Sequence, residues 1–130
     1  MSFTADNQGL IDYSNTNWTF QIPKRLYAFG HFSRFIRPGS TLLTSTSSSS
    51  SVESTAARPT VGNVALVLSN TSAGSITVTV TLKNATTLPA TVTPYVTSAT
   101  QNQAQLAPVT VTNGMFTVTI PATAIMTVAG

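Results

Sequence analysis

The chain has 130 residues, 42% of them hydrophobic and only 7% charged, and its formal net charge is +3. Such a composition, rich in Ser, Thr and Val, favours a β-rich extracellular domain over a cytosolic helical one, because Thr and Val favour strands. Four of the six cations lie between Lys24 and Arg37, so the chain lacks the dense basic surface of a nucleic-acid-binding protein, and no apolar run is long enough to cross a membrane.

Cysteine content and glycosylation sequons bear on the compartment. The sequence has no cysteine, so an extracellular domain of this size must depend on a hydrophobic core rather than on disulfides. Acceptor sequons for N-glycosylation begin at Asn17, Asn70 and Asn84, and they agree with an extracellular location. The first ten residues, MSFTADNQGL, have neither the basic region nor the apolar run of a signal peptide. We expect a secreted protein whose signal peptide is not present in this chain.

An amphipathic helix is predicted between Pro23 and Pro38. Proline suits the first turn of a helix, where its missing N–H costs nothing, and Pro38-Gly39 ends the pattern in the usual way. At about 100° per residue, the apolar side chains fall within roughly a third of the turn. They are Ala28, Phe29, Phe32, Phe35 and Ile36. Before the helix, residues 9–13 could form a short strand or a loop.

A low-complexity passage follows the helix, from Ser40 to Thr60, and contains five consecutive serines, Ser47 to Ser51. Such a tract cannot bury enough apolar area to fix its backbone. Residues 45–60 are therefore predicted to form a mobile, Ser-rich loop. A short strand at Thr41–Thr44 could precede it.

The remainder of the chain predicts short antiparallel strands. Residues 75–82 alternate strictly between apolar residues and Ser or Thr, which is typical of a strand with one buried and one wet face. Pro94 places its strand at an edge or a bulge, and Asn113-Gly114 predicts a hairpin between the strands that flank it. The predicted strands are Val64–Leu68, Ser75–Leu82, Ala90–Thr97, Val109–Thr112, Phe116–Ile120 and Ile125–Val128. Their length and spacing predict an antiparallel β-sandwich over residues 40–130.

Side chains that could carry catalysis are scarce. The three acids are Asp6, Asp12 and Glu53, and nothing in the pattern places two of them opposite each other on rigid elements, as glycoside hydrolysis requires. His31 is the only histidine, so a histidine-based metal site or catalytic triad has little to work with. We interpret it as a packing or hydrogen-bonding residue at the margin of the helix stripe. We expect no catalytic site, no metal site and no cofactor within this chain.

Aromatic side chains outside the helix are the remaining candidates for a binding site. Tyr13 and Trp18 precede the helix in a predicted loop, where binding residues tend to lie. We take them as candidate sugar-contacting residues, with local packing as the alternative. Tyr95 shares a strand face with threonines and could be exposed, but it stands alone. Phe116 shares its face with apolar residues and is predicted to lie in the core.

Three stretches of the chain carry a resemblance to a known family. The first is KRLYAFGHFSRFIRPGS, the second is VALVLSNTSAGSITVTVTL, and the third is YVTSATQNQAQLAPVTVTNGMFTVTIPATAIMTV. The first resembles the last barrel helix of family 30 glycoside hydrolases, particularly fungal enzymes of the endo-β-1,6-galactanase type. The other two are similar to a strand pair and to the closing strands of that family's β-sandwich. The resemblance covers the chain from about Gly9 onward.

The resemblance implies which part of an enzyme this chain would be. Intact members of the family have a (β/α)8 barrel, with two catalytic glutamates on barrel strands, beside the sandwich. No residue of this chain corresponds to either glutamate. Residues 1–39 would be the end of the barrel with its last helix, and residues 40–130 would be the sandwich. The loop that holds Tyr13 and Trp18 would follow the last barrel strand, near the mouth of the active site.

We therefore expect the non-catalytic C-terminal part of a secreted glycoside hydrolase, which braces the catalytic barrel and is inactive alone. The expected partners are that barrel and polysaccharide, but neither nucleic acid nor a membrane. The exposed helix face could also mediate self-association, as could a strand edge that the family fills from the N-terminal end of the enzyme. The alternative is a freestanding carbohydrate-binding or cell-surface adhesion module.

Overall fold

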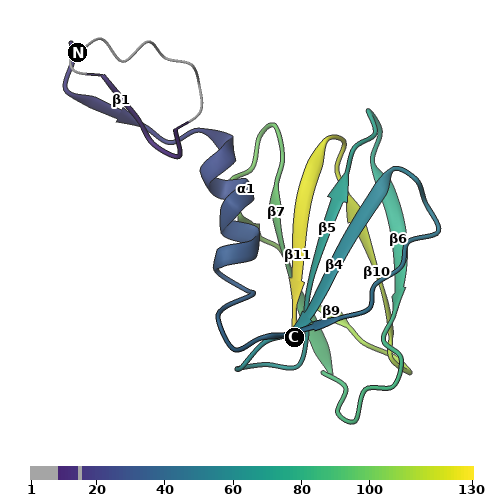
Figure 1. Cartoon of the computed structure of the whole chain (residues 1–130). Coiled ribbons are helices and arrows are strands. Elements are labelled where there is room, and N and C mark those ends of the chain that lie inside the picture. The colour runs from purple at the N-terminus through teal and green to yellow at the C-terminus, as the bar shows by residue number, and fades with distance from the viewer. Residues whose placement is uncertain (1–8, 15) are drawn as a thin grey trace.

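The computed structural model describes residues 9–14 and 16–130 and has a mainly β fold with one helix, which confirms the predicted fold class (Figure 1). The helix α1 is Lys24–Ser33, and the strands are β1 (Asp12–Ser14), β2 (Thr19–Gln21), β3 (Thr41–Leu43), β4 (Val52–Arg58), β5 (Ala65–Asn70), β6 (Ile76–Thr81), β7 (Thr91–Thr97), β8 (Ala104–Gln105), β9 (Val109–Thr110), β10 (Met115–Ile120) and β11 (Ala124–Ala129). Asp6 lies outside the described residues. In the part of the chain that the structure describes, no helix is long and apolar enough to cross a membrane.

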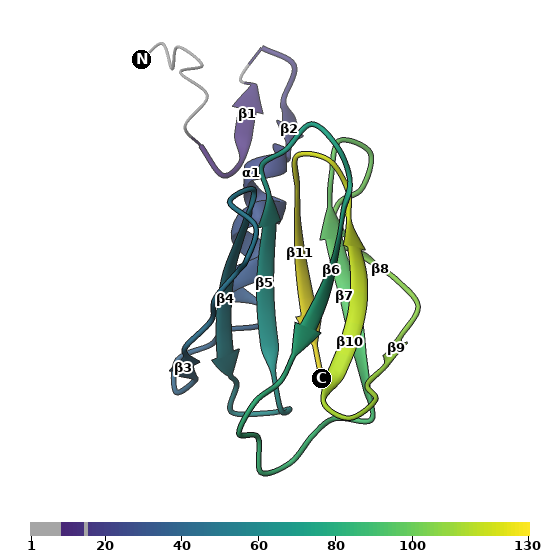
Figure 2. The ribbon, with the colours of Figure 1, turned by 90° about the vertical axis from the view of Figure 1, so that its right-hand side faces the viewer.

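Two antiparallel sheets form the sandwich (Figure 2). The larger sheet has the strand order β3-β4-β5-β11-β7-β8, with β9 also paired to β7, and the smaller sheet consists of β6 and β10. Side chains from both sheets form one apolar cluster. Its buried members are Val52, Val64, Leu66, Leu68, Val92, Val96, Phe116, Val118, Ile120, Ala124, Met126 and Val128. The two layers thus share a single core, as expected for a sandwich.

The alternation in β6 and β10 separates a core face from a wet face. Phe116 of β10 is buried, as predicted, and the apolar residues of β6 pack against the same core. On the outer face, threonine hydroxyls pair across the two strands. The Oγ1 atoms of Thr77 and Thr119 are 2.9 Å apart, and those of Thr79 and Thr117 are 3.2 Å apart. These cross-strand pairs support the register of the smaller sheet.

The prediction of a mobile loop at residues 45–60 is wrong for the second half of that range, because Val52–Arg58 forms β4. This strand pairs with both β3 and β5, and its first residue, Val52, is buried. In the serine run before it, hydroxyls bond to the backbone, as where Ser47 Oγ donates to Ser49 O at 3.1 Å. The sequence of β4 has small and polar side chains without apolar alternation, so it carries no local strand pattern. Hydrogen bonds to two neighbouring strands stabilise it instead.

Asn113-Gly114 forms the predicted two-residue turn but does not join two strands of one sheet. Both residues have positive φ, 52° and 74°, and Thr112 and Met115 exchange two backbone hydrogen bonds of 2.9 Å, which fits a type I′ turn. However, β9 pairs with β7, whereas β10 pairs with β6. The predicted hairpin pairing is therefore wrong. The turn instead carries the chain from one sheet of the sandwich to the other.

Pro94 lies inside the larger sheet rather than at an edge. Strand β7 pairs with β11 on one side and with β8 and β9 on the other. The β9 pairing covers residues 91–92 and the β8 pairing covers residues 95–96, so Pro94 stands where the neighbouring strand is interrupted. Its carbonyl accepts a hydrogen bond from Leu106 N at 2.8 Å. The missing proline N–H therefore faces a gap in the pairing, where it removes no ladder hydrogen bond.

Candidate functional site

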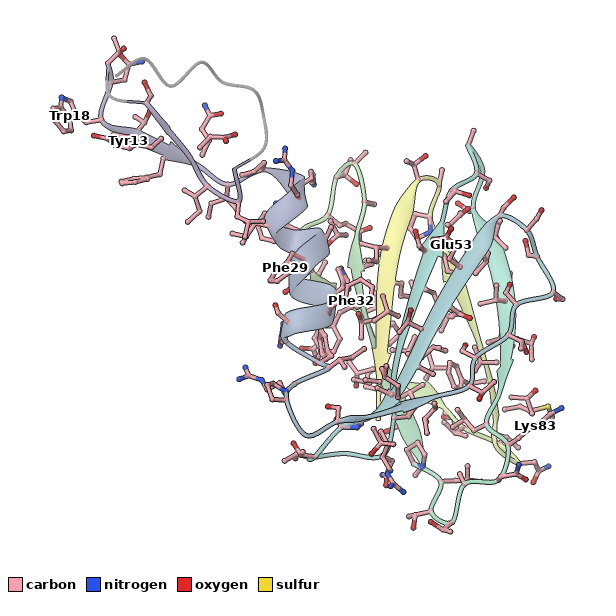
Figure 3. The ribbon with its side chains drawn as sticks, viewed as in Figure 1. Tyr13, Trp18, Phe29, Phe32, Glu53 and Lys83 are labelled. Carbon is pink, nitrogen blue, oxygen red and sulfur yellow. The ribbon has the colours of Figure 1, made fainter. Side chains whose placement is uncertain are left out.

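The two candidate residues Tyr13 and Trp18 lie on a small β1–β2 hairpin that projects away from the sandwich (Figures 1 and 3). Tyr13 is directly opposite Phe20 in the strand register. The ring centroids of Tyr13 and Phe20 are 5.0 Å apart, and those of Tyr13 and Trp18 are 6.3 Å apart in an edge-on arrangement. Trp18 is 78% exposed, Phe20 71% and Tyr13 48%. We call these three residues the aromatic hairpin.

The alternation of β-strands explains how the aromatic hairpin forms. Tyr13 and Phe20 share one side of the two-stranded ribbon, while their strand neighbours, such as Asp12 and Gln21, form pairs on the other side. Trp18 lies in the turn with φ of +53°. The sequence pointed to Tyr13 and Trp18 but not to Phe20. The available signal was that Phe20 is a third aromatic residue in the same short segment.

Exposed apolar side chains concentrate at this end of the molecule. Eight of the fourteen large apolar side chains that are exposed among the described residues fall between residues 10 and 32. They are the aromatic hairpin together with Leu10, Ile11, Ile22, Phe29 and Phe32. Phe29 and Phe32 of α1 are 55% and 41% exposed (Figure 3). An exposed apolar surface of this kind usually marks an interaction site.

The predicted helix stripe is divided between solvent and the sandwich. The regular helix ends at Ser33, and hydrogen bonds such as Ile36 N to Phe32 O extend it by one irregular turn. In that turn Phe35 packs on Tyr95 of β7, with ring centroids 4.8 Å apart. The Arg34 guanidinium lies over both rings, 5.0 and 4.8 Å from their centroids. Tyr95 is therefore half-buried beneath this turn, which leaves it unsuited to a sugar-binding platform.

His31 is the only residue of α1 that is fully buried. Its Nδ1 is 2.8 Å from Thr127 Oγ1 on β11, and its Nε2 is 2.9 Å from Thr97 Oγ1 on β7. Burial, and secondarily the positive charge of Arg34, lower the pKa of the imidazole from 6.5 to about 4. The ring is thus neutral at ordinary pH, and its predicted role as a packing and hydrogen-bonding residue is confirmed.

A groove of about 770 Å³ lies between the first turn of α1 and the loops at one end of the sandwich. Its lining residues are Lys24, Arg25, Ala28, Ser69, Asn70, Thr71, Thr97, Ser98, Ala99, Ala122, Thr123, Ala124 and Ile125. Lys24 Nζ donates to Gln101 O at 3.0 Å and to Asn102 Oδ1 at 2.5 Å. These bonds hold the start of the helix against the loop that follows β7.

The three glycosylation sequons lie in different surroundings. Asn17 and Asn84 are exposed, in the β1–β2 turn and after β6, and both remain candidate acceptors. Asn70 is only 2% exposed. Its Nδ2 donates to Gly74 O at 2.8 Å, to Ile120 O at 3.2 Å and to Pro121 O at 2.8 Å. A glycan would be attached to this nitrogen, and the fold leaves no room for one there. The prediction of Asn70 as a glycosylation site is therefore wrong.

The acids do not form a catalytic pair among the described residues. Asp12 lies on the β1–β2 hairpin, and Glu53 lies exposed on β4 of the sandwich (Figure 3). Within residues 9–14 and 16–130 there is also no group of three His, Cys, Asp or Glu side chains that could hold a metal ion. The candidate site of this chain is therefore a contact surface, made of the aromatic hairpin and the exposed face of α1.

Comparison with known proteins gives structural matches only. No family model matches the chain, and no curated protein matches it. The structure is similar to a GH30 endoxylanase from Clostridium papyrosolvens C71, with 30% identity and a TM-score of 0.79; the match covers 91% of this chain and 30% of that one. A family 30 subfamily 8 xylanase from Clostridium acetobutylicum matches with 26% identity and a TM-score of 0.82, over 97% of this chain and 31% of that one.

A third solved structure is also similar to this chain. The catalytic domain of GH30 xylanase C from Talaromyces cellulolyticus matches with 25% identity and a TM-score of 0.76, over 93% of this chain and 27% of that one. The chain thus spans less than a third of each of these three structures. Its structure matches a region of the family 30 glycoside hydrolase fold, which supports a glycoside hydrolase-related domain of that family.

Proposed function

We propose that this chain is the non-catalytic, C-terminal β-sandwich part of a secreted family 30 glycoside hydrolase, and that it braces the catalytic barrel. The observation that carries the proposal is the exposed apolar face on α1 and the segment before it. Phe29 and Phe32 remain exposed although the helix is packed on the sandwich through its other side. Such a face is typical of a surface that another domain covers.

The length of the solved relatives agrees with a covering domain. More than two thirds of each xylanase structure lies outside the region that this chain matches, so a barrel of ordinary size fits in the remainder. Residues 1–39 would belong to the end of that barrel and residues 40–130 to the sandwich. Without the barrel, we expect the same face to promote self-association.

Two observations bear on the substrate that we propose for the parent enzyme. The sequence resembles enzymes of the endo-β-1,6-galactanase type, and the solved neighbours are called xylanases. The polysaccharides that these enzymes are named for, β-1,6-galactan and xylan, both consist of neutral sugars joined by β-linkages. The aromatic hairpin suits such a substrate, because exposed aromatic rings can stack on the apolar faces of neutral sugars.

The activity test uses the purified chain with β-1,6-galactan and with xylan, and measures the release of reducing sugar. We expect none, because hydrolysis of the usual kind needs two opposed carboxylates, and Glu53 is the only glutamate in the sequence. The heat-denatured chain is the blank, and Glu53→Gln is the matched variant. Sugar release by the native chain above the blank would contradict the proposal. An upstream reading frame that encodes a barrel with two glutamates would support it.

The aromatic hairpin favours a second candidate, a freestanding carbohydrate-binding or adhesion module. In that case the isolated chain should bind an oligosaccharide from a glycan panel saturably, and Trp18→Ala should weaken the affinity by about tenfold or more. Stability should not change, because Trp18 is 78% exposed. Phe29→Ala is the matched control, since it removes an exposed aromatic ring outside the hairpin. Calorimetric titration that shows no saturable binding to any glycan would remove this candidate.

A further inference from the structure

We propose that His31 is an acid-sensitive latch that holds α1 on the β-sandwich and releases it when the ring gains a proton. His31 lies at the helix–sheet interface, where α1 packs on β7 and β11. His31 is fully buried there and reaches one threonine on each of those strands, Thr97 and Thr127. The inference goes beyond the bracing role proposed above and does not depend on it.

The hydrogen-bond network assigns the protons of the neutral ring. The Thr127 hydroxyl donates to the carbonyl of His31 at 3.2 Å, so Thr127 Oγ1 must accept from Nδ1–H. On the other side, Thr97 Oγ1 accepts from the backbone N–H of Gln103 at 2.9 Å, and its own hydroxyl is free to donate to Nε2. Every donor then meets an acceptor, with the proton on Nδ1.

A second proton on the imidazole ring disrupts this pairing of donors and acceptors. Protonated Nε2 becomes a donor and points at Thr97 Oγ1, 2.9 Å away. The Thr97 hydroxyl must then turn its own proton elsewhere, while its oxygen already accepts from Gln103 N. The imidazolium also carries a positive charge into a site with no exposure to water, and such burial is costly unless an opposite charge compensates it.

No carboxylate faces the ring from the elements packed around it. Helix α1 and the turn after it contribute the cations Lys24, Arg25 and Arg34 and the phenol of Tyr27. Strand β7 contributes only Tyr95, and β11 and the loop at residues 98–103 contribute no titratable side chain. The charge that acts on the ring is therefore repulsive, and it comes from Arg34. Among the described residues, no opposite charge is placed to stabilise the protonated form of His31.

Release would be local because the sandwich core has no group that titrates in this range. All members of the core cluster are apolar, whereas the other anchors of α1 lie at its surface. Lys24 Nζ donates to Gln101 O and Asn102 Oδ1, Gln103 Nε2 donates to Tyr27 O at 3.1 Å, and Phe35 stacks on Tyr95. Gly39, with φ of +92°, lies in the connection between the helix and β3. The helix can therefore leave the sheet while the sandwich stays folded.

The direction of the pH dependence follows from the lowered pKa of His31. Above pH 6.5 the ring is neutral both on and off the sheet, and docking has its full strength. As the pH falls from 6.5 towards 4, only the released helix takes up the proton, so docking weakens. Below about pH 4 the loss is complete, and the docking equilibrium is weaker by roughly 10²-fold.

The test combines amide hydrogen exchange with an imidazole titration of the whole chain. Exchange rates, corrected for the intrinsic effect of pH, should show that Lys24–Ser33 loses roughly 10²-fold in protection between pH 7 and pH 3. The strands β5, β10 and β11 should remain protected. Because His31 is the only histidine, its ring resonance needs no assignment and should titrate well below pH 6.5.

Two variants separate the latch from general acid unfolding. His31→Gln keeps a hydrogen-bonding side chain that cannot be protonated, so acid opening of the helix should disappear. Arg34→Gln removes the like charge from an exposed position, so the docked ring should take up its proton at higher pH, and the loss of helix protection in acid should become smaller. The proposal is overturned if helix protection is unchanged at pH 3, if helix and strands open together, or if His31→Gln opens as the wild type does.

Discussion

Replacing Asn70 with Ala is expected to destabilise the fold by roughly 3 kcal/mol, and replacing it with Asp by more than that. The buried Asn70 amide joins two turns of the sandwich. The two hydrogens of its Nδ2 are shared among three carbonyls within 3.2 Å, including Pro121 O in the β10–β11 turn, and its Oδ1 accepts from Ser72 N at 2.9 Å in the β5–β6 turn. Alanine leaves these groups without their partner. Aspartate turns a negative oxygen towards the three carbonyls.

Urea unfolding of the wild type, Asn70→Ala and Asn70→Asp measures the change in the free energy of unfolding. Asn84→Asp is the matched control, because Asn84 also begins a sequon but is exposed, and its change should stay within about 0.5 kcal/mol. If Asn70→Asp is as stable as the wild type, the hydrogen-bond network does not organise the two turns. Equal losses for Asn70→Asp and Asn84→Asp would point to the same conclusion.

Replacing Phe29 and Phe32 together with Glu is expected to weaken association with the parent barrel by about 10²-fold or more, since buried aromatic anchors commonly contribute about 2 kcal/mol each. Stability should change little, because both rings are largely exposed and Glu is a good helix former. The measurement is co-purification, followed by titration, of this chain with a barrel expressed as a separate polypeptide. Sedimentation of the chain alone should show reduced self-association.

The control for this pair is Val61→Glu, which changes an apolar residue that is 87% exposed and lies outside the face on α1. It should leave association unchanged. Undiminished binding by the Phe29→Glu, Phe32→Glu variant would mean that the barrel binds another surface of the chain. A loss of helix content in that variant would be detected by circular dichroism before the binding result is interpreted.

The sequence predicted those parts of the fold that depend on local pattern. The alternation in β6 and the Asn113-Gly114 turn are both local, and both are present. The pairing partners of β9 and β10 were not predictable, because sheet membership is decided by a core assembled from distant residues. Strand β4 was missed for the same reason. Its small polar residues are held by neighbours on either side rather than by their own pattern.

The same distinction holds for the candidate site. The position of Tyr13 and Trp18 before the helix was visible in the sequence, and the structure places both on an exposed hairpin. The surroundings of His31 were not visible, because Thr97 and Thr127 meet the ring only after the helix packs on β7 and β11. Threonine in a strand gives no sign that it will face a histidine more than sixty residues away.

The turn at Asn113-Gly114 has a consequence for how the domain assembles. The chain passes from β5 in one sheet to β6 in the other, returns to β7, and crosses again through β10 to β11. Neither layer is therefore made from one continuous stretch of polypeptide. Each can be completed only while the other is forming, and their pairings are far apart in sequence, which slows folding. The sandwich has no half that could survive as a smaller folded unit, so it should gain or lose its structure in a single step.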